Sequence, residues 1–240
     1  MHTKKNPGNN VSISPDRFAL EEEIDGDIEK YLFQFPTLKE LFAYLRTAGP
    51  IALFGGFVRD RIHKFVHREA IRSRDVDLVV DGPLPARREG EQQNNFGGRR
   101  CAISAAVRVD YWELRSTYAF RKGLFAATLE NLPKTTVYTA NACVFDLQRR
   151  QLTDHHAVEH IARRAVAFNC RSYLDVFPDY QAFRAIELAA RLGYAVDHEV
   201  SQFVKSRFNL TPWASFVAAV QQHRPDLTAD HLRAICEPYR

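Results

Sequence analysis

The sequence predicts an α+β fold in which a mixed front part precedes an all-helical part. Short apolar runs, separated by glycine, proline and charged residues, fill the first stretch of about 170 residues. Apolar residues at helical spacing dominate from Asp179 onward, in YQAFRAIELAARLGY, HEVSQFVKSRF, WASFVAAVQQH and ADHLRAICEPY. Strands followed by a run of helices are typical of this fold class. We therefore divide the chain into a polar lead-in (1–17), a head domain (18–172) and a helical domain (173–240).

The composition is that of a globular protein. The chain has 240 residues, of which 45% are hydrophobic and 26% charged, and this excludes collagen-like and wholly disordered classes. Lys and Arg number 33 against 29 Asp and Glu, so the net charge of +4 permits a phosphate-bearing partner without requiring one. The sequence contains neither an apolar run of membrane-spanning length nor a secretory leader. Its four cysteines form no CxxC pair, so we expect reduced thiols in a cytoplasmic protein without a membrane partner.

The first elements follow from apolar spacing and turn residues. TLKELFAYLRTA (37–48) predicts a helix with Thr37 as N-cap and Glu40 as its capping-box partner, ended by Gly49. The apolar run 51–54 predicts a buried strand, and a Gly-Gly turn separates it from a helix in FVRDRIHKFV. On that helix, His63 and His67 are expected to share an exposed face.

Later segments complete the front part. RDVDLVV (74–80) and VRVDYWEL (107–114) alternate and contain β-branched residues, so both predict strands. The polar stretch 81–99 predicts a loop. Residues 141–147 and 151–153 predict a hairpin around the turn-like QRR, and Gly193 predicts the end of the first C-terminal helix.

Three acids on these strands point to metal-assisted chemistry. Asp75 and Asp77 project to one face, because residues i and i+2 of a strand share a face. Two carboxylates held this close repel each other unless a cation lies between them, and Mg²⁺ prefers such oxygens. Asp110, on the later strand, is available as a third acid. This arrangement is typical of phosphoryl or nucleotidyl transfer, although an isolated D-x-D pair more often marks a solvated strand end.

The glycine turn supplies a second half of the site. Gly55 and Gly56 lack Cβ, so backbone N–H groups there can approach a phosphate closely. The helix that follows directs its positive end at the same anion, and Arg59 adds a guanidinium one turn later.

The ordered set of motifs resembles a known family. GGFVRD (55–60) and RDVDLVV (74–80) are similar to the signature of the tRNA nucleotidyltransferase and bacterial poly(A) polymerase family, the class II nucleotidyltransferases. VDYWELR (109–115), YTANACVFD (138–146) and FRAIELAARLGY (183–194) resemble later motifs of the same family, in the same order. The resemblance covers about two-thirds of the chain, from residue 51 to residue 205.

The resemblance implies a polymerase-β-like nucleotidyltransferase head, with a small mixed sheet and flanking helices, followed by a helical neck. It implies metal-dependent transfer of a nucleoside monophosphate from an NTP, ATP or CTP, to the 3′ end of an RNA, with tRNA as the favoured acceptor. Asp75 and Asp77 would bind two Mg²⁺ ions, and Asp110 would complete the catalytic set. The implied nucleotide-binding residues are Gly55, Gly56, Arg59, Asp60, Arg74, Arg115, Asn141 and Arg184.

Two motifs of the family are replaced here. Its RRDF run corresponds to TTVY (135–138), and its EDxxR, which selects the base, falls on Phe177, Pro178 and Gln181. The resemblance therefore supports the reaction class better than the substrate. Two alternatives stay open: a stand-alone transferase that modifies a protein or a small molecule, and an inactive protein that binds nucleotide or RNA. A protein partner that supplies further grip on the acceptor also stays open.

Overall fold

The computed structural model describes residues 15–71, 73, 75–94 and 97–239. Within these ranges the helices are α1 (Arg17–Gln34), α2 (Pro36–Arg46), α3 (Gly56–His67), α4 (Tyr118–Arg121), α5 (Ala157–Ala162), α6 (Pro178–Leu192), α7 (His198–Leu210), α8 (Trp213–Gln221) and α9 (Ala229–Cys236). The strands are β1 (Ile51–Phe54), β2 (Asp75–Val80), β3 (Gln92–Gln93), β4 (Arg99–Ser104), β5 (Val107–Glu113), β6 (Cys143–Asp146), β7 (Gln151–Asp154), β8 (Ala165–Val166) and β9 (Ala195–Val196).

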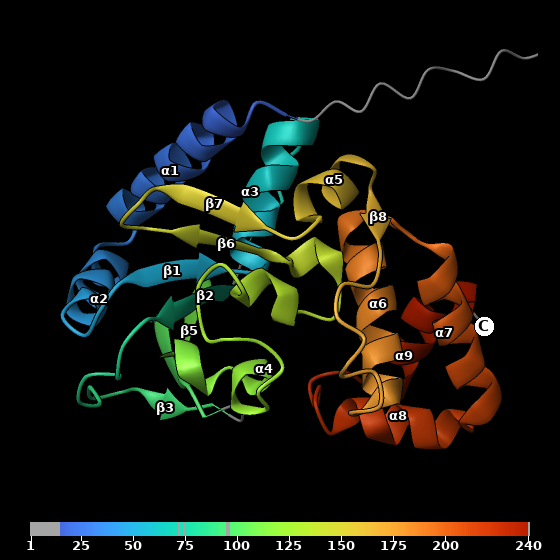
Figure 1. Ribbon diagram of the computed structural model, residues 1–240. Helices are drawn as coiled ribbons and strands as arrows, with labels where there is room; N and C mark the ends of the chain where they lie inside the picture. The colour runs from blue at the N-terminus through green and yellow to red at the C-terminus, as the bar shows by residue number, and fades with distance from the viewer. Residues whose placement is uncertain (1–14, 72, 74, 95–96, 240) are drawn as a thin grey trace, which may run out of the picture.

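A mixed sheet forms the head of the molecule (Figure 1). In the described part of the chain its seven strands lie in the order β3-β4-β5-β2-β1-β6-β7. Only the central pair β2–β5 runs parallel, and the other neighbouring strands are antiparallel. The predicted β1, β2, β5 and the β6–β7 hairpin are thereby confirmed.

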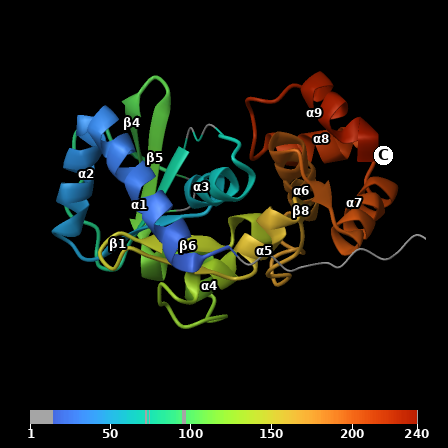
Figure 2. The same ribbon diagram turned by 90° about the horizontal axis from the view of Figure 1, so that it is seen from above.

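Helices α1 and α3 cover one face of the sheet (Figure 2). Side chains at alternate positions of β2, Val76, Leu78 and Val80, pack into the same hydrophobic cluster as the buried stripe of α1. The opposite face carries a smaller cluster beneath α4 and the segment that follows it. Its buried members are Ala52, Val79, Leu114, Ala119, Phe120, Leu129, Leu132, Val144, Cys170 and Tyr173.

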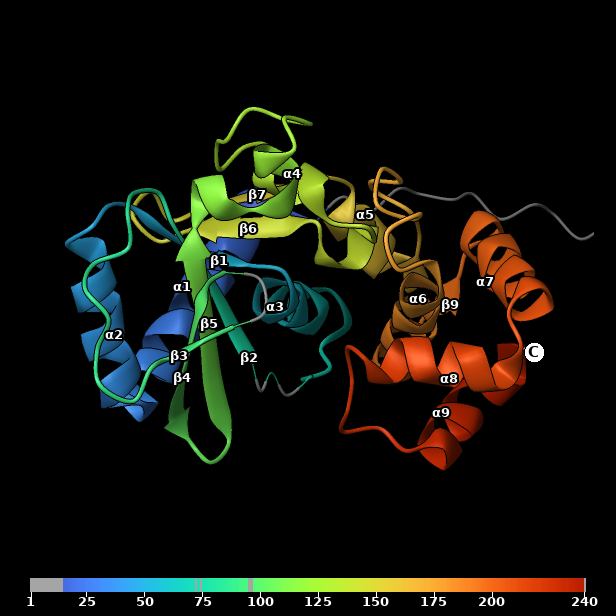
Figure 3. The ribbon, with the colours of Figure 1, turned by 90° about the horizontal axis from the view of Figure 1, so that it is seen from below.

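The C-terminal helices pack around α6 (Figure 3). Gly193 adopts the left-handed backbone (φ 65°) that ends α6, as predicted from its position. The short strands β8 and β9 pair across the predicted domain boundary, and one hydrophobic cluster includes side chains from both sides of it. The division at 172–173 stays a prediction, and residues 1–14 of the predicted lead-in lie outside the described residues. Among the described helices, none combines the length and the hydrophobicity needed to cross a membrane.

Two expectations about local elements were wrong, and one helix was not predicted. The N-cap of α2 is Phe35 rather than Thr37, because Pro36 occupies the first helical turn. The stretch 81–99 includes β3, a two-residue strand at the edge of the sheet whose polar side chains hide its strand character, and it leads into β4. Helix α1 was not predicted, since its narrow stripe of Leu20, Ile24, Ile28 and Leu32 lies within a densely charged segment.

His63 is buried rather than exposed, with 1% of its surface accessible. Its Nδ1 lies 2.7 Å from the Tyr194 hydroxyl oxygen, and its ring stacks on the Tyr194 ring. Helix α3 packs against α5 as well as against the sheet, so the face that bears His63 is covered.

We expect the stability of the protein to fall at acid pH because of His63. Burial, followed by the positive charges of His67 and Arg164, lowers the pKa of His63. The unfolded chain then binds a proton at a pH where the folded protein does not, so stability is lost as the pH falls below about 6.5. Urea denaturation at pH 7 and pH 5 should show a smaller loss for His63→Asn than for the wild type. Replacement of the exposed His231 by Asn is the matched control, and identical losses for all three proteins would contradict this assignment.

Candidate functional site

The parallel pairing of β2 with β5 brings the predicted acids together. Asp77 pairs in register with Asp110, and Asp75 pairs with Arg108. In-register partners on parallel strands project to the same face, and so do residues two apart on one strand. Asp75, Asp77 and Asp110 therefore share one face of the sheet, the face opposite α1 and α3. The neighbouring Phe54 of β1 is in register with Asp77 and borders the group.

Two of the three carboxylates are bound to arginines. The Arg108 Nη2 lies 2.6 Å from an Asp75 oxygen, and the Arg100 Nε lies 2.9 Å from Asp110 Oδ1. A second nitrogen of Arg100 donates to the other Asp110 oxygen at 3.0 Å, so this pair is bidentate. In the described ranges, the acidic, histidine and cysteine side chains form no ready-made metal cage of three or more. A metal that binds Asp75 or Asp110 has to displace these guanidinium groups.

Asp77 lies at the centre of the group. Burial, and then the negative charges of Asp110 and Asp75, raise the pKa of its carboxyl to about 7. The positive charges of Arg184 and Arg59 act in the opposite direction. Ionisation of Asp77 is unfavourable beside two other carboxylates. It becomes favourable when a divalent cation binds between them. This donor set of oxygens fits Mg²⁺.

Gly55 forms the turn between β1 and α3. Its backbone angles (φ 63°, ψ −123°) lie in a region that is essentially restricted to glycine. Its N–H donates to the Cys143 carbonyl oxygen at 2.9 Å, and its own carbonyl accepts from the Arg59 N–H at 2.9 Å. The turn is therefore fixed to β6 on one side and to α3 on the other, with the N-terminus of α3 starting at Gly56.

Arg59 and Asp60 form a buried ion pair behind this turn. Arg59 is 1% exposed, and its Nε and Nη2 lie 2.8 Å and 2.6 Å from Asp60 Oδ1. Arg59 Nη1 also donates to Asn141 Oδ1 at 2.5 Å, while the Ser73 hydroxyl donates to Asp60 Oδ2 at 2.7 Å. A Cβ on Gly56 would lie 3.4 Å from the Arg59 guanidinium. Arg59, Asp60 and Asn141 thus brace the glycine turn, and their contact with a triphosphate stays a prediction.

The remaining predicted residues are spread around the group. Arg184 of α6 lies close enough to Asp77 to lower its pKa. Arg115 is exposed just beyond the end of β5, at the opposite end of the strand from Arg108, so the structure does not place it beside the acids. Arg74 lies outside the described residues.

A chain of ion pairs connects α6 with the loop between α8 and α9. Glu187 binds Arg184 and Arg224, and Arg224 also binds Asp226. The pKa of Asp226 is lowered by Arg224 first and also by the charge of Arg108. The loop therefore lies near the Arg108–Asp75 pair. Sequence reasoning did not identify this chain or the arginines that bind the acids, because each contact depends on tertiary structure.

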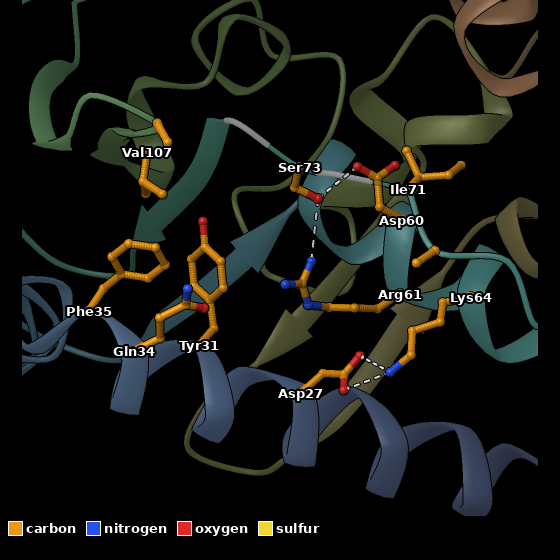
Figure 4. A pocket seen from close by; sticks show the side chains of 12 residues that line it. Asp27, Tyr31, Gln34, Phe35, Asp60, Arg61, Lys64, Ile71, Ser73 and Val107 are labelled. Carbon is orange, nitrogen blue, oxygen red and sulfur yellow. Dashed lines mark hydrogen bonds and ion pairs between the residues drawn. The ribbon is translucent and has the colours of Figure 1, made fainter.

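A separate cavity lies on the other side of α3 (Figure 4). It has a volume of about 260 Å³ and is bordered by α1, α3 and the beginning of β5. Arg61 lines it with its guanidinium 3.2 Å from the centre of the Phe57 ring, and burial lowers the pKa of Arg61 to about 10. Asp60 and Ser73 also border this cavity, whereas Asp75, Asp77 and Asp110 do not. The acids lie instead on the opposite face of the sheet, where Arg184 of α6 acts on Asp77.

Comparison with known proteins identifies the fold. No family model and no curated protein matches the chain. A solved structure of a CCA-adding enzyme with CTP matches 94% of this chain at 17% identity and a TM-score of 0.59, and one with ATP matches 88% at 17% identity and 0.58. A Thermotoga maritima CCA-adding enzyme complexed with tRNA matches 94% at 16% identity and 0.54.

The chain spans about half the length of these solved structures, 54–55% of each. At such low identity the likeness establishes the fold alone. The predicted fold class, a mixed α and β nucleotidyltransferase head followed by helices, is confirmed.

Proposed function

We propose that this protein is a metal-dependent nucleotidyltransferase that moves a nucleoside monophosphate from an NTP to an acceptor hydroxyl. The observation that carries the proposal is the register of β2 with β5, which sets Asp77 beside Asp110 with Asp75 on the same face. The fold shared with CCA-adding enzymes supports it.

In this reaction, the acceptor oxygen forms a bond to the α-phosphorus while the bond to the bridging oxygen breaks, and pyrophosphate leaves. Asp75 and Asp77 would hold two Mg²⁺ ions, which supply positive charge to the phosphate oxygens when they are bound. Asp110 completes the site and would either take the hydroxyl proton or orient the first metal ion. The Gly55–Gly56 turn positions the N-terminus of α3 for the triphosphate, and Arg184 adds positive charge from α6.

The favoured substrates are ATP or CTP and the 3′ end of an RNA, with tRNA the first choice. Matching solved structures are described as complexes of CCA-adding enzymes with ATP, with CTP and with tRNA, which supports this assignment. A protein that acts on tRNA in this way would be cytoplasmic. The expected location and acceptor both stay predictions.

A second candidate is an inactive protein that binds nucleotide or RNA. The ion pairs of Asp75 with Arg108 and of Asp110 with Arg100 favour it, because arginine side chains neutralise both acids without a metal ion. The partly exposed Arg100 and the exposed Arg108 can move away, however, so the pairs do not block the site permanently. Transfer to a protein or a small molecule remains the third possibility.

One labelling experiment separates these functions. The purified chain is incubated with Mg²⁺ and each of four NTPs labelled at the α-phosphate, together with total RNA or with a cell lysate. We expect label in the RNA fraction with the wild-type protein and none with Asp77→Asn. Label in the protein fraction would instead indicate a stand-alone nucleotidyltransferase that modifies a protein. Equal and negligible labelling by both proteins would refute nucleotidyl transfer.

A further inference from the structure

The cavity between α1, α3 and the beginning of β5 contains a partly buried cation without an acidic partner. We call it the Arg61 cavity, and its volume is about 260 Å³. The Arg61 Nη1 donates to the Phe57 carbonyl oxygen at 2.9 Å and to the Ser73 hydroxyl oxygen at 3.4 Å. Neither acceptor is charged. Among the described residues, no carboxylate forms an ion pair with Arg61.

The two acids that border the Arg61 cavity are bound to other cations. Both Asp27 oxygens accept hydrogen bonds from Lys64 Nζ, at 2.8 Å and 2.7 Å. Asp60 Oδ1 lies 2.8 Å and 2.6 Å from two nitrogens of Arg59. Burial outweighs the more distant attraction of both acids for Arg61, and its pKa falls to about 10. The positive charge of Arg61 is therefore not compensated at close range.

One edge of the Arg61 guanidinium has no acceptor. Its Nε is buried and has no hydrogen-bond partner in the part of the chain that the structure describes, and Nη2 donates to no described residue either. These two nitrogens form the planar fork that binds both oxygens of a carboxylate. In Figure 4 the guanidinium extends from α3 toward Tyr31, with Ser73 on one side and Asp27 on the other. A buried donor without an acceptor is unfavourable, and an anion in the cavity would supply the acceptor.

Apolar side chains form another part of the cavity wall. Phe35, Ile71 and Val107 border it and pack against the hydrophobic core. The Tyr31 ring, also on the wall, has its centre 5.5 Å from the Arg61 guanidinium carbon. An apolar cavity of about 150 Å³ holds a benzene molecule. The larger Arg61 cavity therefore has room for one ring that carries a charged group.

The charge of the Arg61 cavity favours a carboxylate over a phosphate. One unpaired guanidinium offsets one negative charge, which is the charge of a carboxylate. A phosphate monoester carries about 1.5 to 2 negative charges at neutral pH. Its excess charge would lie without a counter-ion in a cavity that Asp27 and Asp60 also border.

From this cavity and its unpaired arginine, we propose that the protein binds a small organic carboxylate at Arg61. The carboxylate accepts hydrogen bonds from Nε and Nη2, and its apolar body packs against the ring and aliphatic side chains of the wall. The site is separate from the three acids, since Asp75, Asp77 and Asp110 do not border the Arg61 cavity. The inference therefore does not depend on the proposed nucleotidyl transfer.

Two-dimensional NMR of the full chain, with benzoate as the probe, tests the site. We expect benzoate to shift the amide signals of Gln34 and Val107, which border the cavity, and not that of Asp77. Arg61→Met should weaken benzoate binding by at least about tenfold, the scale of hydrogen bonds to a charged group. Its Tm should equal or exceed that of the wild type, because an unpaired charge is removed from a buried place. Arg233→Met alters an exposed arginine of α9 and is the matched control, with unchanged benzoate affinity.

A second variant keeps the positive charge. Arg61→Lys retains the charge and loses the planar fork. It should bind benzoate more weakly than the wild type and more tightly than Arg61→Met. Benzoate affinity equal to that of the wild type in both Arg61 variants would overturn the proposal.

Three further probes separate the charge from the apolar body. Benzyl alcohol has the ring without the charge, and acetate has the charge without the ring, so each should bind at least about tenfold more weakly than benzoate. Benzyl alcohol that binds as tightly as benzoate would overturn the role of Arg61. Inorganic phosphate that binds more tightly than benzoate would overturn the choice of a carboxylate. A wild-type protein that binds none of these probes would refute the site.

Discussion

Asp77→Asn should lower nucleotidyl transfer by about 10³-fold or more while leaving the protein folded. Asp77 is the central member of the three acids, and its loss removes a charge that the proposed metal ions require. Turnover measured with saturating NTP and acceptor would show the loss in kcat, because the substitution acts on the transition state rather than on binding alone.

The stability of the same variant provides its control. The pKa of Asp77 is raised to about 7, so the ionised carboxylate opposes folding increasingly as the pH rises from about 4 to 7, and the full destabilisation is present above pH 7. Asparagine does not ionise, and Asp77→Asn should therefore have a higher Tm than the wild type at pH 8 in the presence of a chelator. Full activity of this variant would refute the assignment of Asp77. A lower Tm would show that the loss of activity reports unfolding.

Asp60→Ala should lower the free energy of unfolding more than any other single substitution named above. The substitution leaves the Arg59 guanidinium buried without its carboxylate partner, and breaking a buried ion pair in this way costs about 3–5 kcal/mol. For a chain of this length, the loss corresponds to a Tm lower by about 6–20 °C. Differential scanning calorimetry at neutral pH measures it directly.

Two further variants show whether the pair or the packing is responsible. The double variant Arg59→Met, Asp60→Leu removes both charges and should recover much of the lost stability. Glu199→Ala breaks the exposed pair with Arg171 and should change the free energy of unfolding by less than about 1 kcal/mol. An Asp60→Ala variant as stable as Glu199→Ala would mean that water reaches Arg59 and that the pair is not a structural brace.

Local sequence patterns predicted the centre of the fold well. The period of two in RDVDLVV and VRVDYWEL gave both the strands and the faces of their acids, since side-chain alternation depends only on backbone geometry. The Gly55–Gly56 turn was equally predictable, because few residues adopt the conformation of Gly55.

Features that depend on tertiary contacts were not predictable in this way. Arg59 seemed suited to a phosphate, but its neighbours bury it against Asp60 and Asn141. His63 was expected on an exposed face because periodicity does not show that α5 covers α3. Strand β4 was missed since one of its arginines, Arg100, gains its partner Asp110 only when β5 pairs with β4.

The pairs formed by Arg100 and Arg108 imply competition for the acids. Each arginine is a counter-ion tethered to the protein, always present beside Asp110 or Asp75 at a fixed effective concentration. A divalent ion that arrives with a nucleotide has to displace these guanidinium groups from the carboxylates. A monovalent ion carries no more charge than a guanidinium group, so it displaces them less readily. The same arrangement lets the folded chain tolerate the removal of metal, because the repulsion between carboxylates is already partly offset from within.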